Sequence, residues 1–336
     1  MIRFQSRIIA LFYSKKIRQI ATAAEMVSAS LLNISAFVFI FTIFFSSSHY
    51  EESVMKKGWK ILLWALGVLV LLVGGLFVYL YPAMKPMMSI QEIRTTDKLT
   101  LVIGGGGNSG ILESENLVMV IDTKMGGSAK ELYALAKQKA GKRPILVVNT
   151  HVHGDHTGGN KYYAGARILA GTYDEKLWRE QNGQENMPTE WLKDSIGIPM
   201  DDEMVSIVNM GQAHTFSDVV IYFHKRKMLF AGDLIQYKMH PFLNPVTGCK
   251  ALNYSVALNR IQKTFDIQTL VPGHGPTGGM ELLTTFQQYF RDMETIAKDD
   301  SRQDLKSQYS DWTALPFFSS SDVTIKHLKA ELSAAK

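Results

Sequence analysis

The longest apolar stretch of the chain lies near its N-terminus and contains no charged residue. It runs from Ile61 to Tyr81, which is 21 residues. A helix rises about 1.5 Å per residue, so this stretch is long enough to cross the roughly 30 Å hydrocarbon core of a bilayer. Pro82 follows it and is expected to end the helix. The pattern predicts one transmembrane helix.

The charges around this stretch predict how it is oriented. Lys56, Lys57 and Lys60 precede it, and basic residues favour the cytoplasmic side of a membrane. We therefore expect an uncleaved signal anchor, a single pass, and a folded domain outside the cytoplasm. A second apolar stretch, Leu31 to Phe45, has only 15 residues. If it also spans, the two helices form a hairpin and the domain returns to the cytoplasm.

Beyond residue 98 the apolar positions fall into short runs, which are typical of buried strands. Between the second and third runs, Ser128 to Glu131 form a capping box, and the helix that it opens is expected to end at Gly141. Strand, helix and strand in this order predict a βαβ unit with parallel strands. The predicted strands are residues 99–103, 117–122, 144–149, 166–170, 219–223, 227–231 and 268–271, and helical periodicity marks residues 254–265 and 282–296.

A cluster of metal-binding side chains follows the predicted strand over residues 144–149. Within six positions the chain carries His151, His153, Asp155 and His156. Imidazole and carboxylate groups are ligands for a borderline metal such as zinc. A helix would scatter these side chains and a strand would send them to opposite faces, whereas a tight loop could aim them at two adjacent points. The cluster therefore predicts a metal site at the end of a strand.

Three further residues of the same kind end or follow later apolar runs: His214, Asp233 and His274. The whole pattern is H-x-H-x-D-H, then His, then Gly-Asp, then Gly-His-Gly. It resembles the metallo-β-lactamase-fold hydrolases, the superfamily that includes glyoxalase II. The resemblance covers about residues 99–277 and fills all seven ligand positions, although Thr215-Phe216-Ser217 replaces the more usual Thr-Pro-Gly.

The resemblance implies two metal sites. His151, His153 and His214 would hold the first metal, and Asp155, His156 and His274 the second, with Asp233 and a water or hydroxide bridging both. The implied reaction is hydrolysis by the metal-bound hydroxide, and the same metals would polarise the substrate oxygen. Asp155 and Asp233 are the catalytic carboxylates in this scheme, because they supply negative charge and fix the geometry.

Two zinc ions are the expected cofactor. Flavodiiron proteins of the same fold carry a glutamate at the position of His153, so the histidine favours zinc over a di-iron centre. Mononuclear iron dioxygenases of this fold keep the histidines, so iron stays open, as does manganese. The reaction alternatives are a phosphodiesterase or nuclease, a dioxygenase, and a non-catalytic zinc-binding membrane protein.

The substrate is less defined than the site. Glyoxalase II carries a glutathione-binding helical domain after its last histidine, whereas only 62 residues follow His274 here (336 − 274). The bridging Asp233 argues against antibiotic hydrolysis as the main role, because class B β-lactamases do not usually retain it. The sequence therefore predicts hydrolysis of an ester, thioester, lactam or similar bond in a small molecule.

Composition adds few constraints. The chain has 336 residues, of which 46% are hydrophobic and 20% charged, with a formal net charge of +5. Lysine and arginine residues that flank the apolar segments explain part of this charge, so we expect no nucleic-acid partner. Cys249 is the only cysteine, which excludes an internal disulfide. Composition does not define the oligomeric state.

Two other segments allow more than one interpretation. Gly105, Gly107 and Gly110 match G-x-G-x-x-G, but a strand rather than a helix is expected next, so we interpret the segment as a flexible turn beside the metal site. Residues 171–203 form a polar insertion with Trp178 and Trp191, which is either a lid or an ordinary surface helix pair.

The sequence thus predicts an α/β (α+β) fold, a four-layer αββα sandwich preceded by a transmembrane helix. Residues 1–54 form a poorly defined extension, residues 55–85 a signal anchor and linker, and residues 86–336 the metallo-β-lactamase-fold domain. Residues from Ser319 onward are expected to be largely polar, ending in a short peripheral helix that contains His327.

Overall fold

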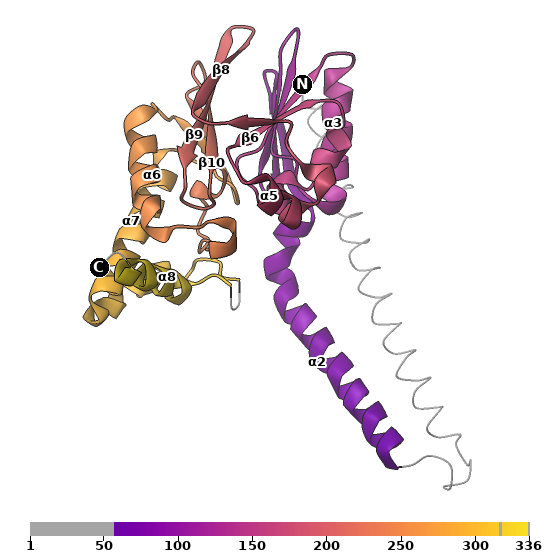
Figure 1. Cartoon of the computed structure of the whole chain (residues 1–336), viewed down its shortest axis with the longest axis vertical. Helices are drawn as coiled ribbons and strands as arrows, with labels where there is room; N and C mark the ends of the chain where they lie inside the picture. The colour runs from indigo at the N-terminus through magenta and orange to yellow at the C-terminus, as the bar shows by residue number, and fades with distance from the viewer. Residues whose placement is uncertain (1–56, 316–317, 335–336) are drawn as a thin grey trace, which may run out of the picture. The chain divides into compact units, whose positions relative to one another are not determined.

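A computed structural model describes residues 57–315 and 318–334 of the chain (Figure 1). The chain divides into two units, residues 1–76 and 77–336, and the division falls within the helix α2. The predictions for Leu31 to Phe45 and for the extension over residues 1–54 lie outside the described residues. Each unit is described by itself.

Helix α2 (Lys57–Met88) contains the predicted transmembrane stretch. Its segment Leu62–Tyr79 has a mean hydropathy of 2.5 and is not buried, so by length and composition it could cross a membrane. The expectation that Pro82 ends the helix was wrong, because the helix continues to Met88. Proline removes one backbone donor at a cost of about 3 kcal/mol, which weakens a helix without forbidding it.

The first β-sheet has seven strands that pair in chain order. The first four are antiparallel neighbours, and the fourth to the seventh are parallel neighbours. Residues 82–98 carry no clear strand pattern and suggest a linker, but the last part of this segment forms the first strand. The strands are β1 (Ile90–Thr96), β2 (Leu99–Gly104), β3 (Ser109–Glu113), β4 (Val118–Ile121), β5 (Ile145–Val148), β6 (Arg167–Gly171) and β7 (Glu190–Leu192).

The second sheet has five strands in the order β12-β11-β10-β9-β8. Only its β11/β12 pair is parallel. The predicted strands over residues 219–223 and 227–231 form a hairpin with a charged tip, and His224 at that tip is exposed. The strands are β8 (Ser195–Met200), β9 (Glu203–Gly211), β10 (Asp218–Phe223), β11 (Met228–Phe230) and β12 (Thr269–Val271).

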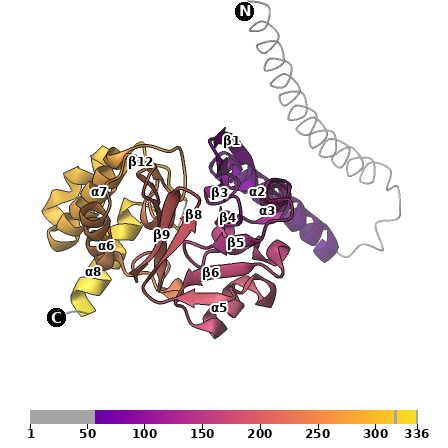
Figure 2. The same cartoon turned by 90° about the horizontal axis from the view of Figure 1, so that it is seen from above.

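The αββα sandwich predicted from the sequence is confirmed, with three apolar layers between four layers of structure (Figure 2). Successive strand residues point to opposite faces. Met119 and Ile121 of β4 therefore pack between the sheets, while Val118 and Val120 pack beneath α3 (Gly126–Ala140). The second sheet packs its outer face on α6 (Ala251–Thr264), α7 (Met280–Lys298) and α8 (Ser321–Ala334).

The shorter helices lie in the connections between these elements. They are α4 (Gly154–Thr157), α5 (Glu175–Asn182), η1 (Asn160–Tyr163), η2 (Gln184–Asn186), η3 (Gly232–Leu234), η4 (Pro245–Thr247) and η5 (Asp300–Tyr309). The 171–203 insertion is therefore neither a helix pair nor a separate lobe, because it contains α5, β7 and β8. Buried Trp178 packs edge-on against Trp191 and Tyr173 inside it.

Two predictions about helix ends and the C-terminus were wrong. Helix α3 begins at Gly126 without a side-chain cap, and Ser128, predicted to cap it, is buried within the helix. The C-terminal helix is not peripheral, because Ile325 and Leu328 are buried in the core. Its Glu331 carboxylate accepts hydrogen bonds from the Ala251 and Leu252 amides at the start of α6, at 2.7 and 3.0 Å.

Candidate metal centre

Four separate segments bring the seven predicted ligands together. The loop after β5 carries His151, His153, Asp155 and His156. The β9–β10 connection carries His214, η3 after β11 carries Asp233, and the segment after β12 carries His274. Their donor atoms form two groups that could each hold a metal ion, and within a group all donor atoms lie within 4.8 Å of one another. The first group is His151, His153, His214 and Asp233, and the second is Asp155, His156 and His274.

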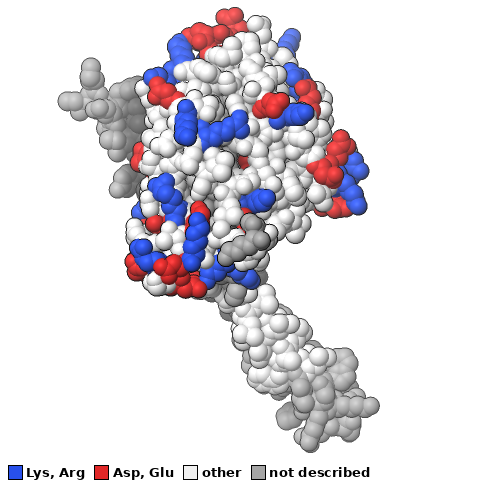
Figure 3. Space-filling view, turned by 60° about the vertical axis from the view of Figure 1, so that its left-hand side comes forward, with Lys and Arg blue, Asp and Glu red and all other residues white. Residues whose placement is uncertain are grey.

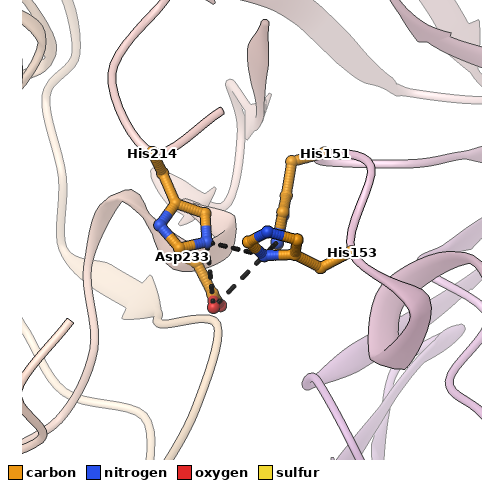
Figure 4. A group of neighbouring side chains, drawn as sticks. All are labelled: His151, His153, His214 and Asp233. Carbon is orange, nitrogen blue, oxygen red and sulfur yellow. Dashed lines mark hydrogen bonds and ion pairs between the residues drawn. The ribbon is translucent and has the colours of Figure 1, made fainter. Parts of the chain in front are cut away.

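In the first group, three imidazoles converge on one carboxylate oxygen (Figure 4). His153 Nδ1 lies 3.1 Å from His151 Nε2 and 2.9 Å from His214 Nε2. Asp233 Oδ2 lies 3.5 Å from His214 Nε2 and 4.0 Å from His151 Nε2. Ring nitrogens this close to one another suit neutral imidazoles that share one cation.

In the second group, His156 and His274 face two carboxylates. His274 Nε2 lies 3.2 Å from Asp155 Oδ2 and 3.4 Å from Asp233 Oδ1. His156 Nε2 lies 3.5 Å from Asp155 Oδ2 and 3.2 Å from Asp233 Oδ1. Asp233 therefore presents one oxygen to each group of imidazoles.

Burial and charge divide the site into two electrostatic environments. Burial lowers the pKa values of His151 and His153, and it lowers that of His214 to about 3, so these candidate ligands are neutral imidazoles at pH 7. Burial alone would raise the pKa of the Asp233 carboxyl, but His274 and His156 hold it well below its usual range.

His156 and His274 respond to the carboxylates beside them. Burial opposes protonation of both rings, but Asp155 and Asp233 raise the pKa of His156 well above its usual value. Asp233 and Asp155 likewise raise the pKa of His274 to about 9. This half of the site thus concentrates negative charge that attracts a cation, whether a proton or a metal ion.

Outer hydrogen bonds fix the orientation of the ligand rings. His156 Nδ1 lies 2.7 Å from Asp122 Oδ2, at the end of the predicted strand over residues 117–122, so Asp122 supports the ring from outside the two groups. His214 Nδ1 lies 2.7 Å from the Tyr254 hydroxyl, and His153 Nε2 lies 3.2 Å from Thr247 Oγ1. Such partners set ring orientation and ligand basicity in metal sites.

The residues fit a metal because two of their polar atoms lack any other partner. His156 Nε2 and Asp233 Oδ1 are buried and lie 3.2 Å apart, but neither atom makes a hydrogen bond of good geometry. Leaving a buried polar atom unpaired costs about 1–3 kcal/mol, so a native protein normally satisfies it. Imidazole nitrogen and carboxylate oxygen are donors for zinc and for other first-row metals.

The glycine segment between β2 and β3 presses directly on this centre. The Gly107 amide donates to the Asp155 carbonyl at 3.1 Å, and the Asn108 amide donates to the Gly273 carbonyl at 2.7 Å. A Cβ atom at Gly107 would overlap the His156 imidazole. The predicted position beside the metal site is confirmed, and close approach explains why glycine stands there.

Gly107→Ala is expected to displace the His156 ring and weaken metal binding at the second group. The methyl group has no space, because it would overlap the imidazole and the hydrogen bond to Asp122 holds that ring in place. Gly127→Ala is a matched control, since no atom lies within 4 Å of a Cβ at that helical position. In a chelator competition, Gly107→Ala should retain metal at least about tenfold more weakly than the wild type, which is the effect of losing a residue that hydrogen-bonds to a metal ligand. Gly127→Ala should retain metal as the wild type does.

Lys124 is a buried residue that the sequence analysis missed. Its ammonium donates to the carbonyls of Val102, Gly104 and Gly107 at 3.0, 2.6 and 2.7 Å. Burial lowers the pKa of Lys124 to about 7, although three acceptors match the three donors of an ammonium group. Lys124 thus fixes the strand and turn that press on Asp155 and His156.

Replacing Lys124 with methionine should destabilise the domain by on the order of 3 kcal/mol, because three buried carbonyls lose their donor. Lys130→Met, at an exposed position on α3, is the matched control and should change stability little. Thermal unfolding of the two variants measures the difference. Equal melting temperatures would show that Lys124 does not stabilise the turn.

The remaining histidines lie outside the two groups of ligands. His240 lies on the wall of a cleft that also includes Asp155, Asp233 and His274. Its Nδ1 is 3.1 Å from the Tyr289 hydroxyl. Among described residues, none from the 171–203 insertion lines this cleft, so nothing supports that insertion as its lid.

Comparisons with known proteins agree with this fold and site. The family model of the metallo-β-lactamase superfamily matches residues 102–274, just over half of the chain. The chain therefore belongs to the metallo-β-lactamase superfamily, and it is a metal-dependent hydrolase by its relatives and its site.

Individual relatives cover similar parts of the chain. The human acyl-coenzyme A thioesterase MBLAC2 is 27% identical over 54% of this chain and 77% of its own length. A metallo-β-lactamase type 2 from Elizabethkingia meningoseptica is 26% identical over 50% of this chain and 68% of its own. The solved metallo-β-lactamase from Pontibacter korlensis has a TM-score of 0.53 at 21% identity, covering 60% of this chain and 98% of its own.

Proposed function

We propose that the protein is a membrane-anchored hydrolase that uses two zinc ions to cleave an ester, thioester, lactam or similar bond in a small molecule. The observation that carries this proposal is the position of Asp233, whose two oxygens face two different groups of imidazoles. When bound, two metal ions would supply a water of lowered pKa as the nucleophile and would polarise the substrate carbonyl.

Each side chain has a defined part in this proposal. His151, His153 and His214 provide neutral imidazoles for one metal, whereas Asp155, His156 and His274 provide a more negative environment for the other. Asp233 links the two positions and keeps them adjacent.

Thioesters are the first substrates to test. The chain is similar to an acyl-coenzyme A thioesterase over most of that protein's length, and the ligand pattern suits attack on any activated carbonyl. The experiment is elemental analysis of protein never exposed to chelator, followed by turnover of a thioester, an ester, a lactam and a phosphodiester. Protein without bound metal, or metal-replete protein that cleaves none of these, would contradict the proposal.

Surface charge supports a small-molecule substrate over a nucleic acid. On the face drawn in Figure 3, lysine and arginine side chains are interspersed with aspartate and glutamate. Among the described residues, ion pairs include Lys98 with Asp201 at 2.8 Å and Arg167 with Glu190 at 2.7 Å. A protein that binds nucleic acid usually presents a continuous basic stripe to the phosphates.

Helix α2 is proposed to anchor the protein in a membrane. The full chain and a chain that starts at Met55 are expected to stay in the membrane fraction after carbonate extraction, because both contain the uncharged Leu62–Tyr79 segment. A chain that starts at Pro86 should be soluble and retain its metals, since β1 begins at Ile90 and every candidate ligand follows it. Full-length protein in the soluble fraction would contradict the anchor.

A further inference from the structure

The candidate metal centre opens into a cleft of about 460 Å³ whose outer wall is apolar. Three segments build that wall: the turn before α3, the chain that follows η3, and the chain between η5 and α8. The apolar side chains come from all three segments and are Met125, Met239, Phe242, Leu315 and Phe318. Such a wall offers apolar contact to a group that lies beside the metal ligands.

Charge is absent from this wall. Among the described residues that line the cleft, only the candidate ligands are ionisable apart from His240, and neither lysine nor arginine is present. A carboxylate or phosphate on the substrate, beyond the group that is attacked, would need a cationic or donor-rich partner here. The wall therefore suits an uncharged group next to the bond that is cleaved.

The Gln236 NH₂ group and the His240 ring are engaged with the protein, and the one unpaired atom of Gln236, Oε1, is buried. Gln236 Nε2 donates to Asp233 Oδ2 at 2.8 Å, and His240 Nδ1 lies 3.1 Å from the Tyr289 hydroxyl. Burial lowers the pKa of His240, so its ring adds no positive charge at pH 7. Recognition of the group beside the metals thus falls to apolar contact.

We propose, on the basis of the hydrolase function proposed above, that this cleft binds the uncharged aliphatic acyl chain of an ester or thioester. The acyl chain lies along the wall of Met125, Met239 and Phe242, with its carbonyl at the metal ligands and the leaving group directed outward. Water oxygen bonds to the acyl carbon as the carbon–sulfur or carbon–oxygen bond breaks. The products are a carboxylate, the thiol or alcohol, and one proton.

Chain-length dependence tests the proposal. Full-length protein in lipid nanodiscs, loaded with zinc, is given N-acetylcysteamine thioesters from acetyl to hexanoyl, so that only the acyl group changes. kcat/KM is expected to rise about two- to fourfold for each added methylene, since complete burial of one corresponds to ~0.8 kcal/mol. Equal values for acetyl and hexanoyl thioesters would overturn the acyl-chain proposal and leave the hydrolase function standing.

A charged side chain placed in the wall tests whether the acyl chain binds there. In Met239→Arg, kcat/KM should no longer rise with acyl chain length, because a cation replaces apolar contact in the cleft. Met204→Arg is the matched control on β9 outside the cleft and should keep the wild-type slope. If Met239→Arg does not fold, Met125→Arg makes the same comparison from a different wall segment. A wild-type slope in the folded wall variant would overturn the assignment.

A binding measurement separates the two proposals. S-hexyl-N-acetylcysteamine is a thioether that cannot be hydrolysed, and calorimetry should show that it binds at least about tenfold tighter than the S-methyl compound. Tighter hexyl binding without turnover of any thioester would support the apolar cleft while contradicting the hydrolase. Thioester turnover without tighter binding of the hexyl compound would support the hydrolase and contradict the acyl-chain proposal.

Discussion

Replacing His274 with alanine is expected to lower the zinc content from about two ions per chain to about one. His274 Nε2 faces both Asp155 and Asp233, and without it the second group keeps only Asp155 and His156 beside one Asp233 oxygen. The first group keeps its three imidazoles, so its metal should remain. Elemental analysis after dialysis against metal-free buffer measures the ratio, and hydrolysis should fall by more than the roughly 10–100-fold typical of losing an outer partner.

His224→Ala is the matched control for this experiment. His224 stands at the exposed tip of the β10–β11 hairpin, where its Nε2 lies 2.8 Å from Ser206 Oγ, and it lies outside both groups of candidate ligands. Its removal should leave metal content and turnover at wild-type values. Two zinc ions retained by His274→Ala would show that His274 is not a ligand, whereas loss of both would show that the groups bind metal as one unit.

Much of the site could be predicted because its chemistry is local in the sequence. His151, His153, Asp155 and His156 lie within six positions, and the apolar run before them marks the strand that delivers them. His214, Asp233 and His274 also follow strands of one sheet, so their meeting at one edge follows from the fold. The inner and outer faces of β4 and β10 likewise follow from strand alternation.

The missed features depend on contacts between distant parts of the chain. Lys124 resembles an ordinary loop lysine, and nothing near it in the sequence reveals that Val102, Gly104 and Gly107 surround its ammonium. Glu331 resembles a solvated residue of a polar tail, yet it caps α6, 80 positions earlier. Capping by a residue so distant leaves no local pattern, because ordinary caps lie within one turn of the helix that they serve.

At the start of α3, a local sequence pattern predicted a helix cap that the structure does not have. Ser128 and Glu131 have the spacing of a capping box, but the helix begins earlier, at Gly126. A Cβ atom at Gly105 would overlap the Ser128 side chain, which places that side chain against the glycine turn rather than at a helix end. Tertiary contact with the turn beside the metal centre therefore outweighs the cap.

Asp233→Asn is expected to reduce kcat by about 100-fold or more, beyond the roughly 10–100-fold cost of losing an outer partner. The substitution nearly keeps the shape of the side chain but replaces one anionic oxygen with an NH₂ group that cannot bind a metal. One of the two groups of imidazoles then loses the oxygen that faces it. kcat should fall more than KM rises, because an interaction that matters mainly in the transition state is lost.

The matched control is Asp202→Asn, which changes an exposed aspartate paired with Lys225 and should leave kcat and KM unchanged. Steady-state kinetics on the substrate that the wild type cleaves gives kcat and KM, and elemental analysis of the same samples gives the metal content. Because Gln236 Nε2 already donates to Asp233 Oδ2, the variant should also lose that hydrogen bond if its amide turns NH₂ toward Gln236. Wild-type kcat with both metals bound in Asp233→Asn would make Asp233 a structural residue and rule out its proposed role in linking the two metal positions.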